Sequence, residues 1–353
     1  MNVMKLETFE ENGYHIYRVP CIVCTGRGTL LVTYEARHGG DWSAMDMMLR
    51  RSIDGGRTWS ERRILAAGNG VDAVHNGILF ADGGTVHFLF HRNYRRLFYC
   101  RSTDDGATWS APREISGAYE ELRARYNWTV IAAGPAHGTV LRNGTLLIPV
   151  WAVSNPREIT SHHPSVVTTL YSRDRGESWH CGEIIPASEE FVDPNESILV
   201  ELSDGRVLIN SRHETPGQCF RKIGGSPDGI SERGGFRFEA QLVDPVCAAS
   251  MVRSEDAVWF LNCRSQRNEG RIRMTVRESS DDCRSWTKEL MIAPLGGYSD
   301  ICYDPAARML HAVVESGRHT QDKFSFDLEV ISFSRDELQA AVPPPGSDHD
   351  CSI

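Results

Sequence analysis

Charged residues gather at one end of the first two apolar runs of the chain. The stretch YHIYRVPCIVCTGRGTLLVTYEARHGGD, from Tyr14 to Asp41, opens its first run with Arg18 and follows its second run with Glu35, Arg37 and Asp41. An arginine guanidinium binds a carboxylate through two parallel hydrogen bonds and always carries its charge. A carboxyl group can donate or accept a proton during a reaction. So many charges at one end are costly to bury unless a ligand and mutual pairing compensate them, so the stretch indicates a ligand site.

A turn motif repeats along the chain and shows which elements must position these charges. The pattern S-x-D-x-G-x-[ST]-W, which we call the aspartate turn, starts at Ser52, Ser102 and Ser172, in altered form at Ser279, and as shorter echoes at Ser226 and Ser334. Its aspartate can accept hydrogen bonds from the backbone N–H groups of its own loop, and its glycine allows a positive φ angle. The six starts lie 50 to 70 residues apart, which predicts six modules.

Each module also contains two apolar runs joined by a short turn, as in VPCIVCTGRGTLLVTYE and ESILVELSDGRVLINSR. Helical periodicity is nearly absent. Four antiparallel strands repeated six times predict an all-β fold, a six-bladed β-propeller with four-stranded antiparallel blades. We expect residues 1–340 to form this single domain and residues 341–353 to be a C-terminal tail, to which we assign no chemistry.

The strand order predicts which residues share an end of the propeller. In an up-and-down blade, the start of strand one, the end of strand two and the loop to strand three lie at one end. The aspartate turns between strands three and four lie at the other end, so we expect Ser52, Ser102 and Ser172 to be structural and to lie opposite Arg18. The residues expected together at the first end are Arg18, Glu35, Arg37, Asp41, His75, His137, Glu196, Arg212, Arg264, Arg267, Arg271, Tyr298 and Glu315.

Short motifs at these positions carry a family resemblance. YRVP at Tyr17–Pro20, the aspartate turns, NSR ending at Arg212, RIRMTV from Arg271 and YSD at Tyr298–Asp300 together resemble the exo-α-sialidase (neuraminidase) family, from about residue 14 to residue 333. The resemblance implies that Arg18, Arg212 and Arg271 hold the carboxylate of a sialic acid, and that Glu315 pairs with Arg18. Arg264, Arg267 and Arg273 are alternatives for the third arginine.

The resemblance also implies the groups that react. Tyr298 is similar to the family's nucleophile, and a neutral phenol suits this task because the anomeric carbon already bears a carboxylate that would repel an anionic nucleophile. A phenol needs a base to attack at neutral pH, and Glu196 is placed to be that base. Asp41 is the expected acid and base, and Arg37 is expected to contact ring hydroxyl groups. Asp46, a competitor of Asp41, is interpreted as a surface residue.

The resulting hypothesis is a retaining exo-α-sialidase that acts on sialylated glycans and needs no metal or organic cofactor. Its alternatives are a trans-sialidase or intramolecular trans-sialidase, a hydrolase of a related nonulosonic or octulosonic acid, and a non-catalytic propeller that binds sialylated glycan or a protein. The insertion AYEELRARYNWTV adds the hypothesis that Tyr126 and Trp128 contact the substrate, with a self-packed loop as the alternative.

Composition excludes several other classes of protein. The chain has 353 residues and a net charge of -9, which argues against binding of nucleic acid or anionic membranes. It has no apolar run of about 18 residues and no recognisable signal peptide, so we expect a cytoplasmic protein, or a secreted one if a leader has been removed. The ten cysteines, including the pair Cys21 and Cys24, are interpreted as reduced core residues. Sequence gives no prediction of oligomeric state.

Overall fold

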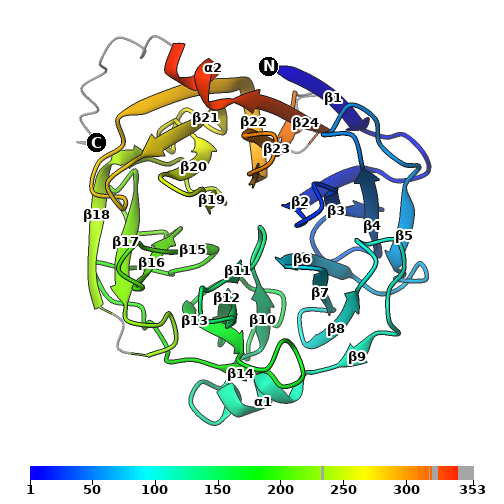
Figure 1. The fold of residues 1–353 in the computed structure, drawn as a ribbon. Coiled ribbons are helices and arrows are strands. Elements are labelled where there is room, and N and C mark those ends of the chain that lie inside the picture. The colour runs from blue at the N-terminus through cyan, green and yellow to red at the C-terminus, as the bar shows by residue number, and fades with distance from the viewer. Residues whose placement is uncertain (232–233, 318, 320–324, 341–353) are drawn as a thin grey trace.

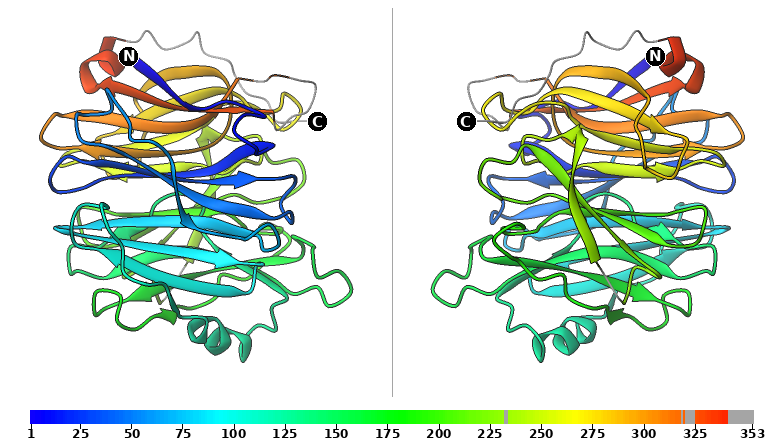
Figure 2. Two further views of the ribbon diagram at one scale, coloured as in Figure 1. Left: turned by 90° about the vertical axis from the view of Figure 1, so that its right-hand side faces the viewer. Right: turned by 90° about the vertical axis from the view of Figure 1, so that its left-hand side faces the viewer.

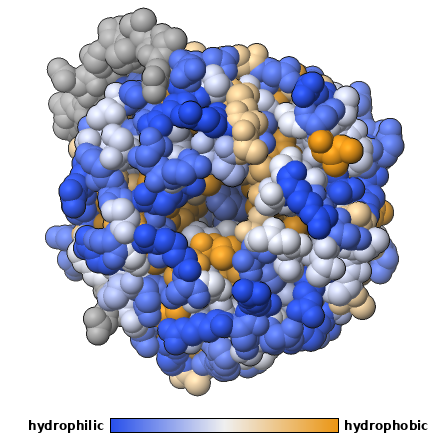
Figure 3. Space-filling model, in the orientation of Figure 1, coloured by the Kyte–Doolittle hydropathy of each residue, from blue (hydrophilic) through white to orange (hydrophobic). Residues whose placement is uncertain are grey.

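The fold was analysed in a computed structural model that describes residues 1–231, 234–317, 319 and 325–340. Within these residues it is built from strands with two short helices, which confirms the all-β prediction. The sheets stand around a central axis as a β-propeller (Figure 1), and Figure 2 shows the same ring from two sides. One face of the ring is hollowed at its centre and mostly hydrophilic around the rim (Figure 3). No helix in the described ranges is long and apolar enough to cross a membrane.

Four sheets are antiparallel and follow the chain order. The first contains β2 (Ile16–Cys24), β3 (Leu30–Arg37), β4 (Met45–Ser52) and β5 (Arg63–Ala66), and the second contains β6 (Val74–Asp82), β7 (Thr85–Arg92), β8 (Arg96–Ser102) and β9 (Arg113–Glu114). The third contains β10 (Val130–Ala133), β11 (Thr139–Val140), β12 (Leu146–Val153), β13 (Ser165–Ser172) and β14 (His180–Cys181). The fourth contains β15 (Ser197–Glu201), β16 (Val207–Ser211), β17 (Phe220–Ser226) and β18 (Gly234–Val243).

The remaining strands form one seven-stranded sheet. The prediction of six separate blades would instead give two sheets of four strands here. It contains β19 (Ser250–Arg253), β20 (Val258–Cys263), β21 (Ile272–Ser279), β22 (Lys288–Asp304), β23 (Met309–Ser316), β24 (Asp327–Ser334) and β1 (Asn2–Glu7). The two sets are continuous because β22 runs unbroken from one to the other: it pairs with β21 up to Leu295 and with β23 from Gly296 onward. The first strand of the chain, β1, pairs with β24 and completes this sheet.

The strand register places the aspartate turns as the sequence predicts. In the first sheet Ser52 pairs with Leu30, which pairs with Cys24, whereas Arg18 pairs with Glu35 toward the other end of the strands. Ser102 and Ser172 likewise lie beside the first residues of β7 and β12.

Each aspartate turn is closed by its own side chains. In the first turn Ser52 Oγ donates to Asp54 Oδ1 at 2.8 Å, and the backbone N–H of Thr58 donates to the same oxygen at 2.9 Å. The same contacts recur in the turns that start at Ser102 and Ser172. The turns are therefore structural links between adjacent strands.

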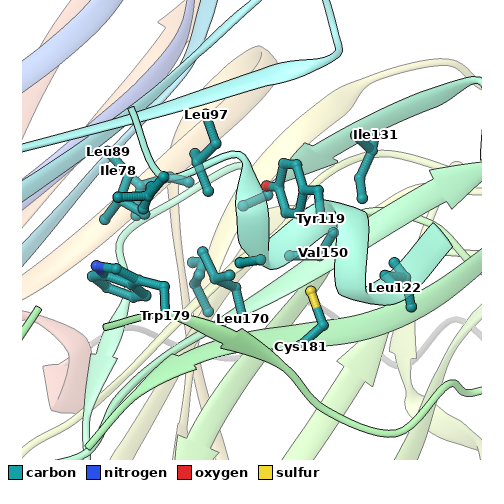
Figure 4. Packing of buried hydrophobic residues seen from close by; sticks show 14 of the residues in the cluster. Ile78, Leu89, Leu97, Tyr119, Leu122, Ile131, Val150, Leu170, Trp179 and Cys181 are labelled. Atoms are coloured by element: carbon teal, nitrogen blue, oxygen red, sulfur yellow. The ribbon is translucent and has the colours of Figure 1, made fainter. Parts of the chain in front are cut away.

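The insertion between the second and third sheets forms the helix α1 (Gly117–Arg123), which packs against β14 on the outside of the ring (Figure 1). Figure 4 shows Tyr119 and Leu122 of this helix against Leu170 and Cys181. Trp128 is 2% exposed in the same cluster and donates its indole N–H to Tyr119 O at 2.9 Å. The hypothesis that Trp128 contacts the substrate is therefore wrong. Tyr126 packs against the same outer cluster, as the alternative of a self-packed loop predicts. The second helix, α2 (Arg335–Ala340), follows β24.

Eight cysteines are thiols rather than disulfides, and all of these but Cys24 are buried, which agrees with the prediction of reduced core residues. Cys219 is disulfide-bonded, so that prediction is wrong for this residue. Cys351 lies outside the described residues, as does the tail predicted for residues 341–353.

Candidate active site

A pocket of about 240 Å³ lies at the end of the strands opposite the aspartate turns. It brings together seven of the eight residues predicted for the site, which are Arg18, Arg37, Asp41, Glu196, Arg212, Arg271 and Tyr298. The eighth, Glu315, lies behind Arg18 and is fully buried. These residues come from three of the sheets: β2, β3 and the loop after β3 in the first, β15 and β16 with their flanks in the fourth, and β21 to β23 with their flanks in the seven-stranded sheet.

The carboxylate of Glu315 fixes both Arg18 and the backbone at Tyr298. Arg18 donates through Nε at 3.0 Å and through Nη2 at 3.1 Å to its two oxygens. The backbone N–H groups of Val19 and Tyr298 donate to the same carboxylate at 3.0 and 2.9 Å. A Cβ atom on Gly297 would lie 2.3 Å from Glu315 Oε2, so this approach requires glycine at that position. One buried acid thus holds an arginine and the phenol's backbone in fixed relation.

Glu196 lies between Arg212 and Tyr298. The Tyr298 hydroxyl donates to Glu196 Oε1, and Arg212 Nη1 donates to Glu196 Oε2 at 2.5 Å. The same Nη1 atom lies 3.1 Å from the Tyr298 hydroxyl oxygen. A carboxylate that already accepts the phenol's hydrogen bond is in position to take its proton.

The phenol is surrounded by positive charge but remains neutral. The guanidinium carbons of Arg18 and Arg271 lie 4.9 and 5.1 Å from the centre of the Tyr298 ring. Burial raises the pKa of Tyr298 and Glu196 raises it further, whereas Arg212 and the other two arginines lower it, and the net shift is upward. The phenol therefore carries its proton at neutral pH.

Of the four candidates for the third arginine, Arg271 is the one that lines the pocket. Arg264 pairs with Glu289, Arg267 with Glu214, and Arg273 with Glu269. The backbone turns sharply here: Arg273 has a φ angle of 56°, and the pairing of β21 with β22 shifts register at Met274. Arg18, Arg212 and Arg271 together are called the arginine cluster.

A second group of charges, Arg37 with Glu35 and Asp41, lies on the first sheet. Arg37 is buried, and its guanidinium donates to Glu35 and to Asp41. Glu35 Oε1 also accepts the backbone N–H of Asn76 at 2.7 Å, so Arg37 is held from behind. Burial would raise the pKa of Asp41, but Arg37 and then Arg18 outweigh it and bring the pKa below its ordinary value. Asp41 is accordingly ionised at neutral pH.

Asp46 is not the surface residue that the sequence suggested. It is partly buried, accepts the Tyr14 hydroxyl at 2.6 Å and accepts the backbone N–H of Gly68 at 2.6 Å. It does not line the pocket. Its role is to hold the loop that precedes β6.

Local irregularities in two inner strands aim the backbone at the pocket. The pairing of β2 with β3 shifts register between Arg18 and Cys21, and Val19 in between has a φ angle of 51°. The pairing of β22 with β23 shifts in the same way between Gly296 and Ser299. Bulges of this kind redirect side chains and are frequent next to active sites.

Sequence reasoning missed the opposite side of the pocket, which comes from the second and third sheets. Its lining residues are Asn76, Tyr94, Trp151, His162 and His163, and Asn195 lies beside Glu196. Trp151 lies near the end of its module's second strand, and Tyr94, His162 and His163 lie in loops between second and third strands. These positions meet the same strand-order rule, but the residues selected with it were charged side chains, two histidines and Tyr298.

The pocket is suited to a small anion. Four arginines, Arg37 and the arginine cluster, line a site that holds one neutral phenol and two carboxylates. Guanidinium groups bind a carboxylate in a planar two-point contact. Among the described residues no group of three or more histidine, cysteine, aspartate or glutamate side chains is arranged to hold a metal ion.

Comparison with known proteins decides the family. Residues 28–307 match the BNR repeat-like domain. The chain belongs to the sialidase family with BNR, or Asp-box, repeats. It is 30% identical over 323 residues to a sialidase of Micromonospora viridifaciens, covering 80% of this chain and 47% of that one, and 26% identical over 314 residues to a sialidase of Bacteroides fragilis, covering 77% and 54%. The chain thus spans about half the length of these relatives.

Solved structures of sialidases share the fold of this family member. The Hadza microbial sialidase Hz136 superimposes with a TM-score of 0.77 at 21% identity, covering 95% of this chain and 69% of that one. An intramolecular trans-sialidase of Ruminococcus gnavus gives 0.75 at 14% identity, covering 96% and 99%. A Trypanosoma rangeli sialidase with 2,3-difluorosialic acid as a covalent intermediate gives 0.70 at 19% identity, covering 95% and 57%. At these identities the likeness concerns the fold.

Proposed function

We propose that this chain is a retaining exo-α-sialidase that removes terminal sialic acid from glycans through a tyrosyl intermediate. The observation that carries the proposal is the contact of the Tyr298 hydroxyl with Glu196 beside the arginine cluster. It unites a neutral nucleophile, a base and a carboxylate-binding group in one pocket. A glycoside whose anomeric carbon bears a carboxylate requires this combination.

Each residue has one role in the proposed reaction. The arginine cluster binds the substrate carboxylate, and Glu315 holds Arg18 in place. Arg37 contacts ring hydroxyl groups and sets the position of Asp41. Tyr298 is the nucleophile, Glu196 its base, and Asp41 the acid and then the base.

The two steps balance without a cofactor. In the first, the Tyr298 oxygen bonds to the anomeric carbon as its proton passes to Glu196, while the bond to the leaving oxygen breaks and that oxygen takes a proton from Asp41, whose carboxylate has first taken up this proton from solvent. In the second, Asp41 takes a proton from water, the water oxygen displaces the tyrosine oxygen, and Glu196 returns its proton to Tyr298. Two displacements at one carbon retain its configuration.

The test is incubation with a fluorogenic α-sialoside, followed by mass analysis and early NMR of the released sugar. Hydrolysis with retention gives free sialic acid that appears first as the α anomer. A released sugar one water lighter indicates an intramolecular trans-sialidase, and sugar found on an added acceptor indicates transfer. Binding of the sialoside without release would leave the non-catalytic glycan-binding propeller as the function.

We also propose that the fold is counted as six four-stranded blades in one catalytic unit over residues 1–340. Support comes from the two halves of β22, which pair with different strands. If each half is counted with its own partners, the seven-stranded sheet divides into two sets of four strands that share β22.

A further inference from the structure

Asp300 is a buried acid below the candidate active site, on the same strand as Tyr298. Its side chain is fully buried, and its carboxylate accepts the backbone N–H groups of Ile22, His137 and Ile301, each at 2.9 Å. Ser250 also donates its hydroxyl to this carboxylate. Ile22 lies on β2, Ser250 on β19, and His137 just before β11. The carboxylate therefore ties β22 to three other inner segments of the ring.

His137 also contacts this carboxylate through its imidazole ring. Its Nδ1 atom lies 2.8 Å from Asp300 Oδ1, and its side chain is mostly buried. Burial lowers the pKa of His137, but Asp300 outweighs it, and the net shift is upward. A buried carboxylate needs hydrogen-bond donors for its oxygens, and the Nδ1 atom of His137 adds one to those from the backbone and Ser250.

Tyr298 lies on a segment of β22 that two buried acids, Glu315 and Asp300, anchor. From Gly296 to Ser299 the pairing of β22 with β23 shifts register, so this segment lacks continuous ladder hydrogen bonds. Side chains hold it instead: Glu315 binds the backbone N–H of Tyr298, and Asp300 fixes the strand two residues later. Loss of either anchor would free the phenol to move away from Glu196.

We propose that His137, through the hydrogen bond between its Nδ1 atom and the Asp300 carboxylate, is a positioning residue for Tyr298. This proposal rests on the function proposed above. His137 does not line the active-site pocket; it lines a second pocket of about 540 Å³ together with Cys24, Glu201 and Arg253, the last residues of β2, β15 and β19. That pocket lies toward the aspartate turns, so His137 acts on turnover and leaves substrate binding unchanged.

The test compares two substitutions of His137 with a matched control. Asn places an amide N–H where Nδ1 lies, whereas Leu keeps the bulk without a donor. The control is His87→Leu, which removes another buried imidazole, bonded to the Tyr99 hydroxyl at 2.8 Å in the second sheet. We expect His137→Leu to lower kcat by about tenfold or more, because small displacements of reacting groups have large effects on rate, and to leave KM within about threefold. His137→Asn and His87→Leu should each stay within about threefold of the parent kcat.

Kinetics are measured below the unfolding temperature of each variant. A folded His137→Leu with parental kcat, or with its loss mainly in KM, would overturn the proposal. If His137→Leu does not fold, His137→Gln replaces it, since Gln places its donor near Nε2 and should lose turnover where Asn keeps it. Equal activity of the Asn and Gln variants would then count against positioning.

A crystal structure separates this proposal from the proposed function, because it needs no turnover. We expect Tyr298 to contact Glu196 in the parent and to have moved in His137→Leu, and an unchanged contact would refute the positioning role. A parent without activity on any sialoside would instead refute the function.

Discussion

At the scale of single residues, the pocket sets opposing influences on one phenol. Burial and Glu196 raise the pKa of Tyr298, and the arginine cluster lowers it without reversing the shift. In the proposed mechanism the uncharged phenol thus approaches an anomeric carbon that bears a carboxylate, and it loses its proton only as the new bond forms. Nucleophile and base have to be considered together for this reason.

We predict that Tyr298→Phe loses turnover and keeps affinity. The substitution deletes the reacting oxygen but leaves the arginine cluster. The activation free energy should rise by several kcal/mol, and kcat falls about tenfold for each 1.4 kcal/mol, with little change in substrate binding. Steady-state kinetics with an aryl sialoside measure both, and Tyr126→Phe is the control, since that hydroxyl bonds to Pro164 O on the outside of the ring. Near-parental hydrolysis by Tyr298→Phe would contradict the mechanism.

We predict that Asp41→Ala loses far more activity on natural sialyl-galactosides than on nitrophenyl sialosides, because an aryl leaving group needs little protonation. The lowered pKa of Asp41 adds a pH dependence. The protonated fraction of a group falls as the pH rises above its pKa, so kcat/KM of the parent on the natural substrate should already decline as the pH rises above about 4, more steeply than on the aryl substrate.

The control for Asp41 is Asp46→Asn, which should affect both substrates alike, because Asp46 holds Tyr14 and Gly68 outside the pocket. Equal losses on the two substrates in Asp41→Ala would remove Asp41 as the acid.

We predict that Arg271→Lys raises KM by about tenfold or more and Arg267→Lys by less than about twofold. Lysine cannot reproduce the planar two-point contact of arginine with a carboxylate. Arg267 pairs with Glu214 outside the pocket lining, so Arg267→Lys makes the same side-chain change away from the pocket. Similar effects of both variants, measured by the substrate dependence of the initial rate, would mean that the third arginine is not Arg271.

At the scale of elements, the sequence predicts the repeated parts and fails on the parts set by packing between sheets. The aspartate turns place the strand pairs and their ends, because each turn is held by its own side chains. The continuity of β22 and the bulge at Val19 have no local signal, since both depend on how neighbouring strands pair. Charged side chains, two histidines and Tyr298 were predicted from the strand-order rule, whereas Tyr94 and Trp151 met the same rule and were missed.

We predict that Gly138→Ala destabilises the protein and Gly84→Ala does not. A Cβ atom on Gly138, next to β11, would lie 1.9 Å from Phe80 in the core, whereas nothing lies within 4 Å of one on Gly84. Overpacking of this kind costs about 1–3 kcal/mol or more. Thermal unfolding should show a clearly lower midpoint for Gly138→Ala alone, and equal midpoints would mean that Phe80 moves aside freely.

At the scale of the whole molecule, the first strand of the chain is bound to the last. β1 pairs with β24, and the buried Glu7 at its end contacts Tyr34, Arg50 and Arg62 of the first sheet. One acid thus joins the seven-stranded sheet to its neighbour across the closure of the ring.

We predict that Glu7→Ala lowers the free energy of unfolding by about 3–5 kcal/mol, because it leaves two arginines without their buried partner. Val3→Ala on the same strand is the control, since Val3 is 52% exposed, and it should change stability by less than about 1 kcal/mol. Denaturant unfolding measures both. A loss in Glu7→Ala no larger than in Val3→Ala would show that closure depends on the strand ladder alone.

The unbroken course of β22 also limits how this chain can be engineered. Insertion of a tag or a reporter domain is tolerated best in exposed loops, and residues 67–73 between β5 and β6, with Val71 81% exposed, offer one. The junction between the last two sets of strands offers none, because it lies inside a strand. One extra residue at Gly296 would turn the following side chains to the opposite face and carry Tyr298 away from Glu196.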